Sequence, residues 1–234
     1  SITFDFFYDK RYNILLHREA WPQSLGFHEA KPWSNKGKVD NWGYEVSTNW
    51  RKQFTKDLTV DFRGTFTYTQ NKYIDVDEPI YPYVWQTATG KPLNRRNGYI
   101  AEGLFQSQEE IDNSPTQNLG SKPMPGDIKY RDVDGNGVID SKDQVMISKT
   151  ANMPRIQYGF GVNIDWKRFN FGVFFNGSAM RDININGLHP FGQNDYNAMK
   201  FVAENRWTEA NPNPNAEYPR LGLNDSQMSN NSQS

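Results

Sequence analysis

The stretch Leu58-Thr-Val-Asp-Phe-Arg-Gly-Thr-Phe-Thr-Tyr-Thr69 decides the fold class, because apolar and hydrophilic side chains alternate along it. Successive side chains of a β-strand point to opposite faces of the sheet, so alternation places like residues on one side. One side carries Leu58, Val60, Phe62, Phe66 and Tyr68, and the other carries Thr59, Asp61, Arg63, Thr65, Thr67 and Thr69. The stretch therefore predicts a strand with one apolar and one polar face.

The same alternation recurs in four other stretches, so the sequence predicts about five strands. It runs from Ile156 to Trp166 and from Phe169 to Asn176, and it recurs near residues 2–16 and 41–51. The apolar members of these stretches are Ile2, Phe4, Phe6 and Tyr8; Trp42, Tyr44, Val46 and Trp50; Ile156, Tyr158, Phe160, Val162, Ile164 and Trp166; and Phe169, Phe171, Val173 and Phe175.

The connections between these strands differ strongly in length. Short polar turns join Trp50 to Leu58 and Trp166 to Phe169, whereas the connections at 17–40, 71–155 and 179–234 are long. Short turns on one side, long loops on the other and aromatic strand ends are typical of a bacterial outer-membrane β-barrel, whose polar face lines the lumen. A secreted β-sandwich also has alternating strands, so a calcium-stabilised, glycan-binding sandwich remains the alternative.

Composition excludes several functional classes. The chain has 234 residues and a formal charge of −1, so it lacks the basic surface expected of a nucleic-acid-binding protein. It has no cysteine, which excludes disulfides and thiol chemistry. Aromatic residues make up 15% of a chain whose mean hydropathy is −0.84, and no stretch approaches the 18 to 20 or so apolar residues of a membrane helix.

Residues 132–143 match a calcium-binding loop of the EF-hand or dockerin kind. Such loops place oxygen ligands at positions 1, 3, 5, 7, 9 and 12, with glycine at position 6. Here the six ligand positions are filled by Asp132, Asp134, Asn136, the Val138 carbonyl, Asp140 and Asp143, and Gly137 stands at position 6. Asp143 replaces the usual glutamate, as in dockerin-like loops. The spacing predicts a structural Ca²⁺ site, although clusters of Asp, Asn and Gly also form ordinary turns.

The long connections carry two predicted helices. Ser107 is followed three residues later by Glu110, which is the spacing of a capping box, so a short helix is expected there. A second helix is expected over residues 195–206, with Tyr196, Met199, Val202 and Ala203 on one face.

Enzymatic chemistry is not predicted. The histidines His17, His28 and His189 are scattered over the connections, and the adjacent Glu109 and Glu110 diverge by about 100° on a helix. The longest connection instead contains four aromatic residues that are candidates for contacting a substrate or a partner protein, or for packing the loop itself. They are Tyr81, Tyr83, Trp85 and Tyr99.

Four segments, in the same order, resemble the C-terminal half of SusC/RagA-type TonB-dependent outer-membrane transporters. They are Gly103 to Ile111, Pro125 to Asp140, Tyr158 to Gly177, and Asn205 to Leu221. The resemblance implies an all-β fold: an antiparallel transmembrane segment of about five strands from a barrel of roughly 22, with long extracellular loops. Both ends of the chain are then expected to be cuts in a longer protein.

The resemblance also implies a function, a location and partners. It implies import of a bulky nutrient, an oligosaccharide or a peptide, across the outer membrane of a Gram-negative, Bacteroidetes-like cell. The expected partners are the rest of the same barrel, outer-membrane lipid, a SusD-like surface lipoprotein that acts as a lid, and the TonB complex, reached through an N-terminal part outside this sequence. No nucleic acid is expected.

Overall fold

The computed structural model describes residues 1–19, 31–150, 153–182, 198–222 and 229–232. These form two compact units, which we call the sheet unit and the loop unit. The sheet unit comprises Ser1–Tyr81, Thr87–Arg95 and Lys149–Ile183, and the loop unit comprises Pro82–Gln86, Arg96–Ser148 and Asn184–Ser234. Among the described residues, no helix combines the length and apolar content needed to cross a bilayer.

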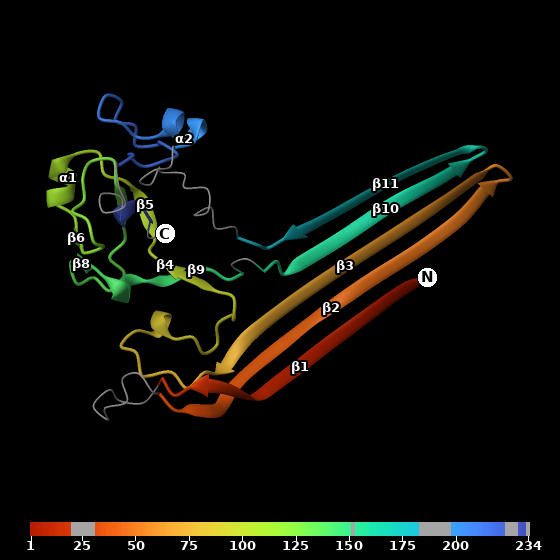
Figure 1. The fold of residues 1–234 in the computed structure, drawn as a ribbon, viewed down its shortest axis with the longest axis horizontal. Coiled ribbons are helices and arrows are strands. Elements are labelled where there is room, and N and C mark those ends of the chain that lie inside the picture. The colour runs from red at the N-terminus through yellow and green to blue at the C-terminus, as the bar shows by residue number, and fades with distance from the viewer. Residues whose placement is uncertain (20–30, 151–152, 183–197, 223–228, 233–234) are drawn as a thin grey trace. The chain divides into compact units, whose positions relative to one another are not determined.

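The sheet unit is one antiparallel sheet of five strands (Figure 1). Its strands, in spatial order, are β1 (Ile2–His17), β2 (Trp33–Thr55), β3 (Leu58–Asp75), β10 (Ile156–Trp166) and β11 (Phe169–Ala179). The predicted all-β, antiparallel fold is therefore confirmed. The sheet is open, with β1 and β11 at its two edges.

The register gathers the apolar residues of all five strands on one face. Phe4 lies opposite Val46, Val46 opposite Phe66, and Phe66 opposite Tyr158, and directly opposite residues share a face. This apolar face stays uncovered, since Phe4 is 63% exposed and Phe171 is 62% exposed. A sandwich would bury such a face under a second sheet, whereas a barrel presents it to lipid.

The opposite face is mostly polar, and its aromatic residues include Phe174 and Phe7. Phe174 lies on this face, where β10 carries Gly159 and Gly161 as its neighbours. A Cβ at Gly161 would lie 2.8 Å from the Phe174 ring, so glycine makes room for the ring to lie close to the strand. The Arg63 guanidinium lies 4.9 Å from the centre of the same ring. Phe7 and Gly43 repeat the arrangement between β1 and β2.

The strands extend beyond their apolar stretches, which corrects two predicted boundaries. β2 begins at Trp33 rather than near 41, and β3 ends at Asp75, so the connections expected over 17–40 and 71–155 are shorter than predicted. The extensions are held by the backbone ladder, as the pairing of Lys38 with Asp75 shows. Their side chains are largely polar, so alternation could not reveal them.

The loop unit consists of short paired strands around a small core. β4 (Arg96–Gly98) pairs with β9 (Val145–Ser148), β5 (Ala101–Leu104) with β7 (Ile128–Tyr130), and β6 (Thr116–Gln117) runs parallel to β8 (Val138–Ile139). Its described residues also include the short 3₁₀ helices η2 (Val84–Gln86), η3 (Ser141–Asp143) and η5 (Ser229–Ser232). The core comprises Tyr99, Leu119, Ile128, Tyr130 and Ile139.

The first predicted helix is confirmed as α1 (Gln108–Asp112). The Ser107 hydroxyl accepts a hydrogen bond from the Glu110 N–H at 3.2 Å, as expected of an N-cap. The Glu110 carboxylate, however, accepts from the N–H of Gln106 rather than from that of Ser107, so the capping box is only half formed. The second predicted helix is shorter than expected, since α2 spans Lys200–Asn205, and Tyr196 lies outside the described residues.

Candidate metal centre

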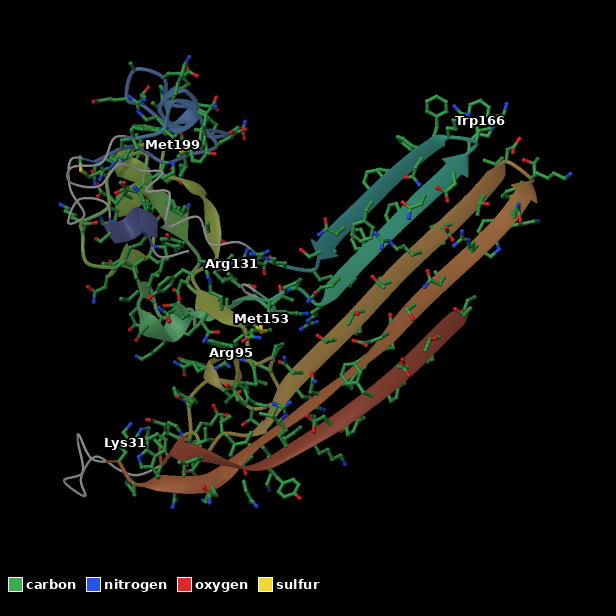
Figure 2. All side chains as sticks on the ribbon, turned by 45° about the vertical axis from the view of Figure 1, so that its right-hand side comes forward. Lys31, Arg95, Arg131, Met153, Trp166 and Met199 are labelled. Carbon is green, nitrogen blue, oxygen red and sulfur yellow. The ribbon has the colours of Figure 1, made fainter. Side chains whose placement is uncertain are left out.

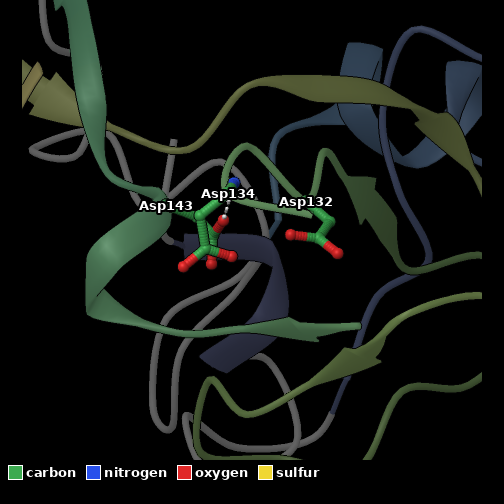
Figure 3. Close-up of side chains that lie close together, drawn as sticks. All are labelled: Asp132, Asp134 and Asp143. Carbon is green, nitrogen blue, oxygen red and sulfur yellow. Dashed lines mark hydrogen bonds between the residues drawn. The ribbon is translucent and has the colours of Figure 1, made fainter. Parts of the chain in front are cut away.

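Three of the predicted ligands come together in the loop unit. Asp132, Asp134 and Asp143 each place a carboxylate oxygen within 4.8 Å of the others (Figure 3). Asp132 and Asp134 precede the tight turn, and Asp143 ends η3, so the 12-residue spacing brings the first and last positions face to face. This is the arrangement that the sequence spacing predicts for a divalent cation.

The turn that brings these carboxylates together depends on glycine and on side-chain hydrogen bonds. Asp132 accepts from the N–H of Gly135 at 2.8 Å and from the N–H of Gly137 at 2.7 Å. Both glycines have positive φ, +73° and +83°, which other residues adopt only with strain. The hydrogen bond from the Gly137 N–H also holds the pKa of Asp132 below its ordinary value, so this carboxylate stays ionised at neutral pH.

Asp143 is the most constrained of the three carboxylates. Its side chain is fully buried and accepts from the N–H groups of Val133 at 2.7 Å, Asp140 at 2.9 Å and Asp134 at 3.3 Å. These bonds fold the end of the loop back onto its beginning. They also place a buried negative charge beside two other carboxylates, an arrangement that is costly without a cation.

The other three predicted ligands have local roles in the loop. Asp140 caps η3, since its carboxylate accepts from the Lys142 N–H at 2.7 Å, and it lies outside the group of three. Position 9 of such loops often binds its ion through water, so this capping role is compatible with the predicted one. The Asn136 side chain accepts from the Val138 N–H at 2.7 Å, and Val138 itself begins β8.

The donor set fits a hard cation. Every candidate ligand is an oxygen, and neither nitrogen nor sulfur takes part in the three-residue group. Carboxylate and carbonyl oxygens on a flexible loop are the ligands that Ca²⁺ prefers, whereas Mg²⁺ requires a stricter octahedron and keeps several waters. The residues present therefore fit the calcium ion that the sequence predicts.

Two of the predicted aromatic residues pack onto this loop. The Tyr83 and Trp85 rings are stacked, with centroids 4.5 Å apart and planes inclined by 8°. The Trp85 indole N–H donates to the Lys142 carbonyl at 2.8 Å. The Tyr83 hydroxyl donates to the Asp134 carboxylate, and this hydrogen bond raises the pKa of the Tyr83 phenol. Hydrogen bonds to residues of the 132–143 loop thus position both rings.

The remaining two predicted aromatics differ in exposure. Tyr81 is 38% exposed, so its ring is available for contact. Tyr99 is 5% exposed and packs against Tyr130 in the core of the loop unit, where its hydroxyl accepts from the Gln144 amide. Of the two interpretations given for Tyr99, its place in this core agrees with packing of the loop.

The histidines form no site in the described part of the chain. His17 ends β1, and its ring lies 3.7 Å from the Trp33 ring, centroid to centroid. His28 and His189 lie outside the described residues.

Sequence reasoning missed an ion pair and a cavity in the loop unit. Arg220 pairs with the fully buried Asp127 carboxylate at 2.6 Å. Nearby, a cavity of about 500 Å³ is lined by residues that include Arg206, Trp207, Arg220 and Met124. Trp207 packs over Gly126, whose φ is +90° and whose Cβ, if present, would lie 2.2 Å from the ring. No local pattern could have indicated contacts between residues so far apart in the sequence.

The chain is similar in sequence to TonB-dependent receptors over most of its length. The chain matches no model of a known protein family. It is 28% identical to TonB-dependent receptor P26 of Formosa agariphila over 92% of its length, and 25% identical to TonB-dependent receptor P3 of the same organism over 94%. It is 26% identical to TonB-dependent receptor SusC of Bacteroides thetaiotaomicron over 73%. The chain spans about a fifth of the length of these relatives, 22% for P26 and P3 and 17% for SusC.

Solved structures share the fold. The RagAB peptide transporter superposes with a TM-score of 0.65 at 18% identity, covering 95% of this chain and 24% of the transporter chain. The RagAB peptide importer in its open-open state gives a TM-score of 0.59 at 18% identity, over 95% of this chain and 23% of that one.

The open sheet with one apolar face therefore has the fold of a segment of the RagAB β-barrel, and the sequence is similar to that of TonB-dependent receptors. Within that class, the predicted resemblance to the SusC/RagA type is confirmed, because SusC is among the sequence relatives and RagAB is among the structural neighbours.

Proposed function

We propose that this chain is part of an outer-membrane, TonB-dependent importer of bulky nutrients. The single observation that carries the proposal is the sheet, which is apolar and uncovered on one face and polar on the other across all five strands. A sheet with one apolar and one polar face is typical of the wall of a membrane β-barrel, which separates lipid from an aqueous lumen. The likeness to TonB-dependent receptors over more than nine-tenths of the chain supports the same reading.

In this proposal the chain contributes structure rather than chemistry. The apolar face meets outer-membrane lipid, the polar face lines the lumen, and the edges β1 and β11 pair with the rest of the same barrel. The TonB complex supplies the energy through another part of the protein. The relatives are receptors of the transport machinery, which agrees with a role other than that of an enzyme.

The cargo that we propose is an oligosaccharide or a peptide. RagAB, a structural neighbour, is a peptide transporter, and SusC, a sequence relative, is a TonB-dependent receptor. We further propose that a SusD-like surface lipoprotein closes over the barrel and contacts the exposed aromatic residues of the long connection. Tyr81 is the best placed of the four predicted residues, and Tyr83 and Trp85 are half-buried.

We also propose that Ca²⁺ binds the loop of residues 132–143 as a structural clip. The three grouped carboxylates and the buried Asp143 support this proposal, because their mutual repulsion needs a cation to offset it. The clip would fix the position of Tyr83 and Trp85 through their bonds to Asp134 and Lys142. The ion would thereby give the long connection one fixed surface.

The proposal is tested by purifying the protein, with an affinity tag, from membranes of its native source. We expect it in the outer-membrane fraction, soluble only in detergent, together with a surface lipoprotein. We also expect uptake of its cargo to stop when the TonB complex is deleted. Recovery of the protein from the soluble fraction without detergent would contradict the proposal, as would uptake that continues without TonB.

A further inference from the structure

The end of the sheet that carries the short turns has a composition of its own. We define the short-turn rim as the last residues of β2 and β10, the first residue of β11 and the two turns that join these strands. Its aromatic members are Trp50, Phe54, Trp166 and Phe169, and its basic members are Lys52, Lys56, Lys167 and Arg168. Basic and aromatic side chains are thus interspersed at one end of the sheet.

The two turns lie side by side, so the rim is a single surface. The N–H of Lys167 donates to the Asp57 carbonyl at 2.8 Å, which links the β10–β11 turn to the β2–β3 turn (Figure 1). Trp166 lies opposite Leu58 of β3 and opposite Phe169 of β11. Figure 2 shows the Trp166 side chain at this end of the sheet.

Lys52 occupies the apolar face itself. It lies opposite Val60, which lies opposite Ile164, so its neighbours across the sheet are residues that face lipid in the proposed barrel. Its ammonium lies 5.1 Å from the centre of the Phe54 ring, and that of Lys167 lies 5.5 Å from the centre of the Trp166 ring. A lysine on this face is tolerated where its ammonium reaches the headgroup region, and aromatic rings favour the same depth.

Arg51, the basic residue between Trp50 and Lys52, lies on the polar face and pairs with Asp61 at 3.7 Å, so the unpaired charge of the rim comes from the four residues named above. Within the described residues, none of the four basic side chains forms an ion pair. The opposite end of the same sheet differs, since Arg11 pairs with Asp9 at 2.7 Å and Lys36 with Asp77 at 3.1 Å. The two turns hold one carboxylate, that of Asp57, and three cations, and Lys52 adds a fourth cation near the end of β2.

We infer that the short-turn rim binds the phosphate groups of anionic phospholipids in the leaflet that it faces. The inference rests on the proposed function, because it requires the apolar face to meet a bilayer. An ammonium held over an aromatic ring at headgroup depth attracts lipid phosphate, and cations near a membrane surface each contribute to binding anionic lipid. Lys52 and Lys167 are the central contacts, and Lys56 and Arg168 add charge beside them.

The test uses the purified protein in vesicles of phosphatidylcholine containing spin-labelled lipid, either phosphatidylglycerol or phosphatidylcholine. Electron paramagnetic resonance then gives the preference of the protein surface for the anionic lipid. We expect the unsubstituted protein to prefer the anionic lipid. In the protein that combines Lys52→Gln and Lys167→Gln, this preference should fall by about fivefold for each lysine removed. The pair Lys52→Arg and Lys167→Arg should retain it, and so should the control pair Lys122→Gln and Lys200→Gln in the loop unit.

Three results would overturn the inference. The first is an unchanged preference in the Lys52→Gln, Lys167→Gln protein, and the second is an equal loss in the control pair. The third is abolition of the preference by about 10 mM inorganic phosphate at constant ionic strength, which would mark a site for free phosphate rather than for a lipid headgroup. Failure of the protein to insert into vesicles at all would instead contradict the proposed barrel.

Discussion

Val162→Arg is expected to destabilise the membrane-inserted protein by about 2–4 kcal/mol, which is the cost of an arginine on the lipid face near the bilayer midplane. Val162 lies in the middle of β10, opposite Phe62 on one side and Val173 on the other, so the guanidinium would have apolar neighbours and lipid around it. The change should lower the urea concentration at which the protein unfolds in vesicles.

The neighbouring substitution Asn163→Arg is the matched control. Asn163 lies on the polar face, opposite Asp61 of β3, where an arginine has water and a carboxylate nearby. Its cost should be about 0–1 kcal/mol, as for other exposed polar positions. Equal effects of the two substitutions, or a larger effect at Asn163, would mean that the apolar face does not meet lipid.

Removal of the ion from the 132–143 loop is expected to expose the loop unit to protease while the sheet stays folded. Chelation removes only the proposed cation, whereas Asp132→Ala combined with Asp134→Ala removes two of its proposed ligands and also the acceptor of the Gly135 and Gly137 N–H groups. Both treatments leave the hydrogen bonds of Asp143 in place. Trypsin should then cleave more rapidly after Arg131 and Lys142. Ca²⁺ at one hundred times its dissociation constant should raise the free energy of the opening that exposes these cleavage sites by about 2.7 kcal/mol.

Asp143→Ala should have a larger effect than the double substitution. It removes a proposed ligand and also leaves the half-buried N–H groups of Val133 and Asp140 without their acceptor, at up to about 1–3 kcal/mol for each. Glu109→Ala is the control, because it removes an exposed carboxylate of the same unit. Cleavage rates that do not respond to chelation, or a response that excess Mg²⁺ reverses as well as Ca²⁺, would contradict a calcium clip.

The sequence predicted the features that depend on local spacing. Alternation from Leu58 onward fixes the face of each residue, and the register then aligns the faces of neighbouring strands. The approach of Asp132, Asp134 and Asp143 was predictable for the same reason, since these residues lie within twelve positions of one another and the intervening glycines permit the positive φ that the turn needs.

The features that the sequence did not reveal depend on distant contacts. Trp33 and Asp75 extend their strands by backbone pairing, which leaves no side-chain pattern. From the sequence alone, Tyr99 fits either an exposed contact residue or a core residue. Its packing against Tyr130, which only the structure shows, decides between the two. The ion pair of Asp127 with Arg220 joins residues that are far apart in the sequence. No sequence pattern near either residue predicts the other as its partner.

The measurement that tests the barrel most directly is a cysteine scan of β10. The chain contains no cysteine, so a single introduced cysteine within it carries a nitroxide at a known position. In native membranes, labels at Phe160, Val162 and Ile164 should be accessible to oxygen dissolved in lipid, and labels at Gln157, Asn163 and Asp165 to a water-soluble nickel complex. Such a period of two is the predicted result, whereas labels that are shielded from both reagents on the apolar face would show a covered core and contradict the account.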